Sequence, residues 1–452
     1  FTLFATYAAR TAKSFAAYQR PVFAPGTLSA YPEGYLPEQT SDSDGLAITF
    51  QLAGSHLGWD WLATYHQGGD ELDWTLQDSI NLSLEDASTA TPITEFLIGN
   101  NESGIQELSL KANRYLDLPI AKSNRIELGF DYQLSDHEIE RGDQSSFING
   151  NALTAAGVLQ PAGSQQVIGI RPRNEFDEGR TTYAVFAELQ SAWENNLSTR
   201  VGARYSDYDD IGGEFDASAA LAWQPAKTLS VHMDVARGHR APDMGQRFYN
   251  GTFVRYFDQT LTRVEVLNSQ SALGQALGAR ELDAETSLSA NLSARWRPAD
   301  AWEFKAAIAW IDIDDRLLLS DAIGNANVTA LFQSAGIEAE RAAFYTNGAD
   351  TKTTSVDLGA SYRLTLPGSH IDFDLDASLY DTKASSNDTA VGRRVLQRLE
   401  EGGLGGRHLP VDEEDPADAP QRLTRLGGRR IVRQHRLEVP DCRAEVLFLE
   451  VA

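Results

Sequence analysis

Acidic side chains in the run IDIDD have the composition of a calcium site, because carboxylate oxygens are preferred ligands of that ion. The run places Asp312, Asp314 and Asp315 within four residues. An EF-hand loop counted from Asp312 requires Gly at its sixth position and Glu at its twelfth. The sequence has Leu317 and Ile323 at these positions. We therefore interpret the run as the end of a strand.

Two further groups of acidic residues are also interpreted as something other than metal sites. Asp372, Asp374 and Asp376 occupy alternate positions, which places three carboxylates on one polar face of a strand. The segment 136–140, DHEIE, begins a long link and is interpreted as solvated, with a role in holding a metal chelate as the alternative. The single cysteine, Cys442, excludes a disulfide framework and a cysteine-based zinc site. No metal site and no cofactor are predicted.

Enzyme motifs are also missing from the sequence. It contains no HExxH pair, nucleophile elbow, P-loop or dinucleotide fingerprint. Its Ser, His and acidic residues show no spacing that would assemble a triad. We therefore predict no catalytic residues and no enzymatic activity.

Composition narrows the class of protein. The chain has 452 residues, with 39 Lys and Arg against 64 Asp and Glu, so its net charge is −25. This disfavours nucleic acid as a partner, because affinity for phosphates comes from basic groups. The mean hydropathy is −0.34, and no run of about 18 apolar residues occurs, which excludes a transmembrane helix. A transmembrane β-barrel stays open, because its strands alternate apolar and polar residues.

Period-two alternation is the main structural signal. Leu229, Val231, Met233 and Val235 alternate with polar or small residues, as in a strand with two different faces. The same pattern predicts twelve strands and a thirteenth over 1–9. The twelve lie near 46–54, 58–67, 104–116, 124–138, 181–193, 197–210, 214–224, 228–238, 285–297, 301–313, 351–364 and 369–382.

The links between these strands differ in length in a regular way. Short links join the strands into hairpins, and long links at 68–103, 139–180, 239–284 and 314–350 separate the hairpins. Only the link at 211–213 breaks the rule. Short turns at one rim and long loops at the other are typical of an outer-membrane barrel, whose neighbouring strands pair antiparallel. Aromatic residues near both strand ends are interpreted as interfacial girdles.

The two phases of the strands predict two environments. We expect the apolar phase to face lipid, with Leu229, Val231, Met233, Val235, Leu288, Leu292, Phe373 and Leu375 pointing outward. The polar phase, with Asp234, Asn291, Arg295 and Asp374, should point inward to a wet lumen. An arginine in place of Val231 should cost about 2–4 kcal/mol if that residue lies near the midplane, and far less in place of Ser230.

Three motifs in register carry a family resemblance. The stretch 200–248 has "G-x-R-Y", then "W-x-P", then "G-H-R-A-P", the last with His239 in place of the usual Phe. The stretch 281–320 has an "L-x-x-E" strand, and 345–364 has Asn347–Gly348 followed by Asp357 in place of the usual Glu. The residues are Gly202, Arg204, Tyr205, Trp223, Pro225, Gly238, Arg240, Ala241, Pro242, Glu285, Asn347 and Gly348. This pattern resembles the barrel of TonB-dependent outer-membrane receptors, clearly over 180–383 and by alternation alone over 46–138.

The resemblance implies an all-β fold, an antiparallel up-and-down transmembrane β-barrel of about 22 strands around a plug. The sequence supplies 12–13 strands and nothing like the plug or the TonB box, so it implies a partial barrel that is inactive alone. It further implies the outer membrane of a Gram-negative bacterium, contact with outer-membrane lipid, the TonB complex as partner, and a scarce substrate. A ferric siderophore, cobalamin or an oligosaccharide fits, bound by unknown residues in loops 139–180, 239–284 and 314–350.

The C-terminal stretch differs in character from the rest. Residues 384–452 are rich in arginine, contain no lysine, and have one aromatic residue, Phe448. We expect two parts: a partial barrel over 1–383, and a non-barrel tail over 384–452 that is out of frame or disordered and does not extend the sheet.

Two other classes stay open on the sequence alone. A passive porin-like channel has the same strand pattern and needs no plug. A soluble β-rich binding or adhesion module would bury the apolar phase in a core. The gene sequence upstream would show whether a plug is encoded, which distinguishes a receptor from a passive channel. Dependence on detergent for extraction would distinguish a membrane barrel from a soluble module.

Overall fold

A computed structural model describes residues 1–20, 30–85, 91–154, 156–257, 260–386 and 445–449. Fourteen strands form one large sheet in the order β16-β15-β13-β12-β9-β8-β7-β6-β5-β4-β3-β2-β1-β17. Thirteen of them follow one another up and down along the chain. They are Thr2–Phe15 (β1), Glu38–His56 (β2), Trp59–Gln77 (β3), Phe96–Leu116 (β4), Ser123–Arg141 (β5), Phe176–Ala192 (β6), Leu197–Tyr208 (β7), Gly212–Ala226 (β8), Leu229–Arg240 (β9), Glu285–Ala299 (β12), Trp302–Leu319 (β13), Tyr345–Leu366 (β15) and Ser369–Ser386 (β16).

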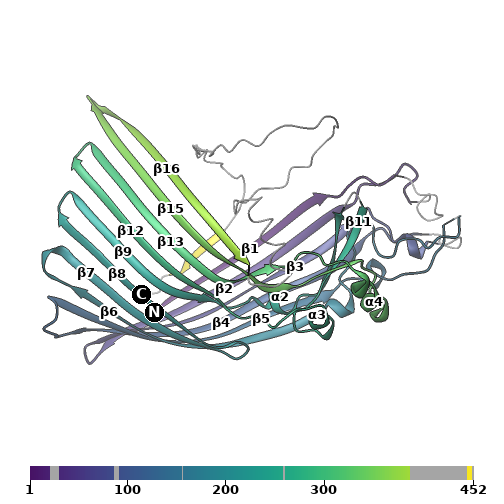
Figure 1. Ribbon diagram of the computed structural model, residues 1–452, viewed down its shortest axis with the longest axis horizontal. Coiled ribbons are helices and arrows are strands. Elements are labelled where there is room, and N and C mark those ends of the chain that lie inside the picture. Colours follow the sequence, from purple (N-terminus) through teal and green to yellow (C-terminus); the bar gives the residue numbers. More distant parts are fainter. Residues whose placement is uncertain (21–29, 86–90, 155, 258–259, 387–444, 450–452) are drawn as a thin grey trace.

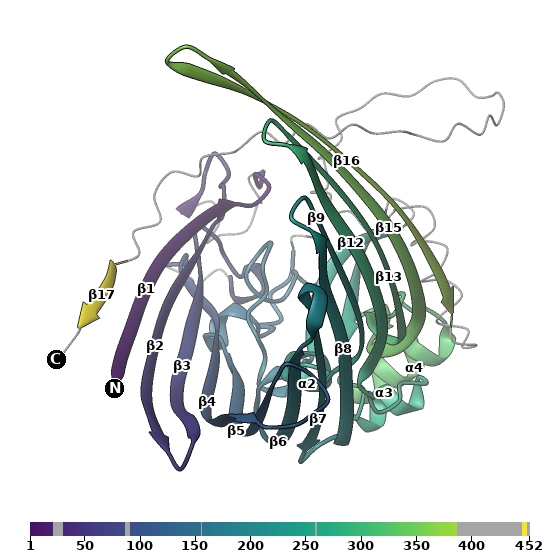
Figure 2. The same cartoon turned by 90° about the vertical axis from the view of Figure 1, so that its left-hand side faces the viewer.

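All neighbouring strands of this sheet pair antiparallel. The prediction of antiparallel pairing in sequence order is therefore confirmed, and so is the thirteenth strand. The sheet curves into a trough with β1 and β16 at opposite sides (Figure 2). It does not close, so its shape is that of a partial barrel.

The pairing register separates the two phases of alternation. Val231 lies opposite Trp223, Met233 opposite Leu221, and Asp234 opposite Ala220. Partners in a ladder share a face, so the apolar phase of every strand falls on one face and the polar phase on the other. On the polar face Arg204 of β7 reaches Asp131 of β5, two strands away, at 2.5 Å, and side chains converge in this way on the concave side of a curved sheet. The polar face is therefore the inner face, and the apolar residues lie outside, as predicted.

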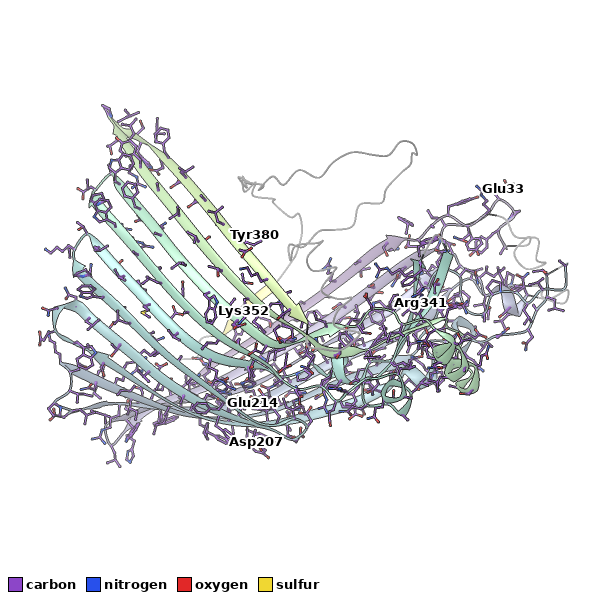
Figure 3. The ribbon with its side chains drawn as sticks, viewed as in Figure 1. Glu33, Asp207, Glu214, Arg341, Lys352 and Tyr380 are labelled. Carbon is purple, nitrogen blue, oxygen red and sulfur yellow. The ribbon has the colours of Figure 1, made fainter. Side chains whose placement is uncertain are left out.

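Aromatic rings form two bands on the outer face. Trp61, Trp193, Trp223, Trp296 and Trp302 lie near the short turns, and Tyr65, Tyr183 and Tyr205 lie toward the long loops. All eight side chains are exposed. Tyr380, labelled on β16 in Figure 3, is an exception. It lies opposite Ser355, in the phase of Asp374 and Asp376, and its register therefore assigns it to the inner face.

Most strands are longer than alternation predicted. Strand β3 runs to Gln77 instead of 67, and β2 begins at Glu38 instead of 46. The extra residues lie at the long-loop end. In β2 they are polar in both phases (EQTSDSDG, 38–45), whereas in β3 the apolar residues change phase, from Trp61, Ala63 and Tyr65 to Leu72, Trp74 and Leu76. Alternation marks a strand only while the same face stays apolar, so it ended where the outer face became polar.

The long links contain structure of their own, gathered at one end of the strands (Figure 1). Short helices lie at Met244–Phe248 (α2), Ala272–Ala276 (α3) and Ala326–Ala335 (α4). Strands Gly251–Phe257 (β10), Thr260–Val266 (β11) and Arg341–Ala343 (β14) form a second sheet in which β11 and β14 run parallel. Single helical turns occupy Leu82–Leu84 (η1), Gln144–Ser146 (η2) and Pro172–Asn174 (η3), and a fourth, Glu194–Asn196 (η4), forms the short turn between β6 and β7 at the opposite rim. Among the described residues, no helix has the length and apolarity of a membrane span.

The C-terminal expectation is wrong at two places. Strand β16 continues to Ser386, and Glu445–Leu449 (β17) pairs antiparallel with β1. Residues beyond 383 therefore do extend the sheet. The rest of the expected tail, 387–444, lies outside the described residues, and its origin in a wrong reading frame stays a prediction that the source DNA can test.

One close contact on the inner face predicts a measurable strain. The ring of Phe186 covers Gly129, and a Cβ added to Gly129 would lie 2.1 Å from Phe186 Cε1. Gly129→Ala should therefore displace the ring and lower the free energy of unfolding by about 1 kcal/mol, measured by urea unfolding in detergent micelles. At Gly202 an added Cβ would meet atoms no closer than 3.5 Å, so Gly202→Ala is the control. Equal losses in both variants would contradict the packing argument.

Candidate functional site

The apolar core of the described chain lies mainly at the loop end. One cluster joins Leu267, Val328, Phe332 and Ala342, and a second joins Leu76, Phe96 and Ile98. A third consists of Tyr35, Ile80 and Leu82. Burying such side chains stabilises a unit by about 1.5–3 kcal/mol each. The long loops thus pack into a body of fixed shape above the trough, which we call the loop body.

Ion pairs tie the three longest loops together within the loop body. Arg173 donates to Glu265 from Nε at 3.2 Å and from Nη2 at 3.1 Å, and the Glu265 side chain is almost fully buried. Arg171 and Arg263 both approach Glu338, at 3.9 and 3.4 Å. These contacts connect loops 139–180, 239–284 and 314–350. Burial, followed by the charge of Arg173, lowers the pKa of Arg171.

The structure brings two motif residues into direct contact. Arg240, the last residue of β9, donates from Nε at 3.0 Å and from Nη2 at 2.9 Å to the carboxylate of Glu285, the first residue of β12. The same carboxylate accepts the backbone N–H of Leu317 at 2.7 Å. Burial alone would raise the pKa of Glu285. The hydrogen bonds from Arg240 and Leu317 outweigh it and hold that pKa below its usual value.

A third motif residue joins the same junction. Asn347 donates through Nδ2 to the carbonyls of Asp283 at 2.9 Å and Asp315 at 2.7 Å, and it accepts the Asp283 N–H at 3.0 Å. Gly348 follows it in β15. Arg240, Glu285 and Asn347 therefore fasten the loop ends of β9, β12, β13 and β15 to one another.

A pair of buried arginines fixes the next junction. Arg180 on β6 donates to both carboxylate oxygens of Asp210, at 2.7 Å for the shortest contact, and to the carbonyl of Pro242 at 2.8 Å. Arg247 in α2 also pairs with Asp210. Asp210 lies in the short turn between β7 and β8. This turn, the exception to the loop-length rule, anchors the segment that follows Ala241.

His239, the departure from the family pattern, has polar partners that phenylalanine could not serve. Its Nδ1 lies 2.7 Å from Asp216 Oδ1, and its Nε2 lies 2.8 Å from Tyr208 Oη. An ionised carboxylate only accepts, so we assign the proton to Nδ1, with Tyr208 donating to Nε2. The Arg180 guanidinium lies 5.6 Å from the Tyr208 ring centroid. Burial raises the pKa of Tyr208.

The remaining motif residues do not meet at this site. Gly202 and Arg204 lie on the inner face of β7, where Arg204 pairs with Asp131 at 2.5 Å. Tyr205 belongs to the outer aromatic band. The other members of the motif set lie at strand ends or turns, with Trp223 and Pro225 at the short-turn rim and Gly238 within β9.

The acids considered as metal ligands are dispersed among other partners. Asp312 pairs with Lys352 at 2.7 Å, and Asp372 pairs with Arg363 at 2.7 Å. His137 Nε2 lies 2.6 Å from Asn101 Oδ1. No group of three His, Cys, Asp or Glu side chains in the described part of the chain could hold a metal ion.

Sequence reasoning missed Arg173, Arg180, Asp210, Arg247 and Glu265. These residues lie in loops or at their edges, where no periodicity marks the partner of a charged side chain. The one available signal was the short link at 211–213, which is adjacent to Asp210.

Comparison with solved structures supports the class of fold. The outer membrane transporter YddB from Escherichia coli has a TM-score of 0.55 and 12% identity, and the similarity covers 85% of this chain and 46% of that one. The FrpB iron transporter from Neisseria meningitidis gives 0.46 and 12%, covering 86% and 52%. The siderophore receptor PirA from Acinetobacter baumannii gives 0.45 and 11%, covering 86% and 55%. The chain thus spans about half the length of these proteins. Curated proteins gave no match.

The likeness to YddB supports a β-barrel fold, present here in part. Residues 3–427 match the family described as TonB dependent receptor-like, beta-barrel. Because this match covers nearly the whole chain, the chain belongs to the β-barrel family of TonB-dependent receptors.

Proposed function

We propose that this chain is the barrel portion of a receptor that takes up a scarce substrate across the outer membrane of a Gram-negative bacterium, energised by TonB. A ferric siderophore, cobalamin or an oligosaccharide is the expected kind of substrate. The family match over residues 3–427 carries the proposal. The plug and the TonB box would belong to the whole protein, and the open sheet alone is not expected to transport.

The loop body supports a role in capture. Its apolar clusters and the ion pairs of Arg173, Arg263 and Glu338 fix three long loops relative to one another. A preformed site loses less conformational entropy when it binds than a mobile one. A rigid mouth above a polar inner wall suits a receptor that must recognise a dilute solute before admitting it.

The inner wall supports a role in passage. Its arginines are paired with carboxylates, as in Arg204 with Asp131 and Arg200 with Glu188. Because each of these arginines has a carboxylate beside it, this part of the wall is polar and hydrated but does not create a strong electrostatic potential of one sign. Such a wall can accommodate a plug or a polar solute, and a soluble module with this apolar exterior would expose Leu288, Leu292 and Leu375 to water.

Uptake that depends on TonB tests the proposal. The complete receptor would be expressed in a strain that lacks its own receptors, with and without functional TonB. Labelled ferric siderophores, cyanocobalamin and malto-oligosaccharides would be supplied below micromolar concentration. We expect uptake of one probe class that disappears without TonB. Uptake that persists without TonB would instead identify a passive channel.

A further inference from the structure

The outer face of β6–β9 carries a groove that the transport function does not use. Its volume is about 620 Å³. Ala187, Ala203 and Ala217 are direct partners across three strands and form its floor. Their small side chains leave a hollow between larger apolar neighbours such as Leu189 and Leu288, which also line it.

The row of alanines ends on a guanidinium. Ala217 lies opposite Arg237 on β9, and Arg237 lies opposite Leu288 on β12. The row rises toward the loops, because Ala187 is four residues from Tyr183 of the aromatic band, whereas Ala203 is two residues from Tyr205. Arg237 therefore lies at the level of that band, where head groups meet hydrocarbon.

Arg237 differs from the inner arginines in its partners. Arg180, Arg204 and Arg240 each pair with a carboxylate. Arg237 is exposed, donates to the carbonyl of Phe215, and forms none of the ion pairs found among the described residues. An unpaired charge beside hydrocarbon is costly unless a counter-charge is supplied. Within the described part of the chain, donors of this guanidinium are free at the end of an apolar groove.

We propose that this groove binds a phosphate-bearing lipid of the outer leaflet, with an acyl chain along the alanine row and a phosphate on Arg237. The fork of N–H donors of arginine matches phosphate oxygens. The apolar hollow and the unpaired Arg237 lie in the order in which the tail and the phosphate head of such a lipid would bind. A second copy of this chain would fit less well, because the outer-face residues that flank Arg237, Ala217 and Leu288, offer no carboxylate in return.

Lipid binding by the full 452-residue chain, folded in a zwitterionic detergent, tests the proposal. Native mass spectrometry would follow titration with lipid A, with dephosphorylated lipid A and with inorganic phosphate. Arg237→Gln should weaken binding of lipid A by roughly tenfold, as expected for loss of a charged hydrogen bond. Ala203→Leu, which fills the hollow, should weaken it by at least about fivefold.

Two matched variants complete the design. Arg237→Lys keeps the charge and should restore most of the affinity. Ala306→Leu adds the same side chain on the outer face of β13, opposite Ala294 and away from the groove, and should change binding by less than about twofold. The proposal is overturned if Ala203→Leu and Ala306→Leu behave alike, if dephosphorylated lipid A binds as well as lipid A, or if inorganic phosphate displaces the lipid. Dimers that form without bound lipid, and that Arg237→Gln disrupts, would assign the groove to a second copy.

Discussion

Met233→Arg is expected to lower the free energy of unfolding by about 2–4 kcal/mol, the cost of a charge near the midplane on the lipid face of a barrel. Met233 is half exposed on the outer face. It lies between Leu221 on β8 and Leu292 on β12, so both direct partners of a new guanidinium would be apolar. Unfolding by urea from lipid vesicles, followed by tryptophan fluorescence, measures the loss.

Two controls make the result specific to depth and face. His232→Arg places the same side chain on the inner face one residue away and should cost less than about 1 kcal/mol. Val231 lies opposite Trp223 of the short-turn band, so it is not at the midplane, and Val231→Arg should also cost about 1 kcal/mol or less. If all three variants lose the same stability, the outer face does not contact lipid.

Arg240→Gln should lower the free energy of unfolding by about 2–3 kcal/mol, because it leaves the Glu285 carboxylate buried with a single remaining donor. The Glu285 side chain is 10% exposed, and the Leu317 N–H would be that donor. The loop ends of β9, β12 and β13 should loosen together. Hydrogen exchange at Leu317 and urea unfolding would report the local and global effects.

Arg200→Gln is the matched control for this prediction. Arg200 is also on the inner face, but it contacts Glu188 at 3.3 Å and is 58% exposed, so its loss should cost less than about 1 kcal/mol. The pH dependence gives a second check. The pKa of Glu285 is lowered on folding, so its contribution is present above the unfolded pKa and is lost as pH falls through the folded pKa. Acidification should therefore weaken the wild type more than Arg240→Gln, and parallel pH profiles would argue against the pair.

The membrane-spanning part of the fold could be predicted from the sequence because each strand there faces lipid on one side and water on the other. Its residues must therefore alternate between apolar and polar. Leu288, Leu292 and Phe373 had to alternate with polar residues, and the alternation fixed strand existence, pairing and face. Tyr380 shows what alternation leaves open: an aromatic residue near a strand end suits either face, and only its register with Ser355 assigns it to the inner one. The start of β2 was missed because it is polar on both faces, and the end of β3 because its apolar residues change phase, with Trp74 and Leu76 packing into the loop body.

The candidate site was predictable only where a motif carried it. Arg240, Glu285 and Asn347 were singled out because they match the motifs of the family, but their contact was not predicted, since the residues are far apart in the chain. Arg180 and Asp210 lacked even that signal. A salt bridge between loops depends on the path of both backbones, which no local pattern encodes.

The polar continuation of the strands past the aromatic band determines how far the molecule reaches. A tilted strand needs about 9–11 residues to cross hydrocarbon, and β3 has 19. Roughly half of β3 therefore stands as a stiff wall outside the bilayer and carries the loop body away from its surface. In a cell envelope coated with sugar chains, that height sets which solutes can collide with the mouth at all. Shortening these walls should thus reduce the encounter rate with bulky solutes while leaving the affinity of the mouth unchanged.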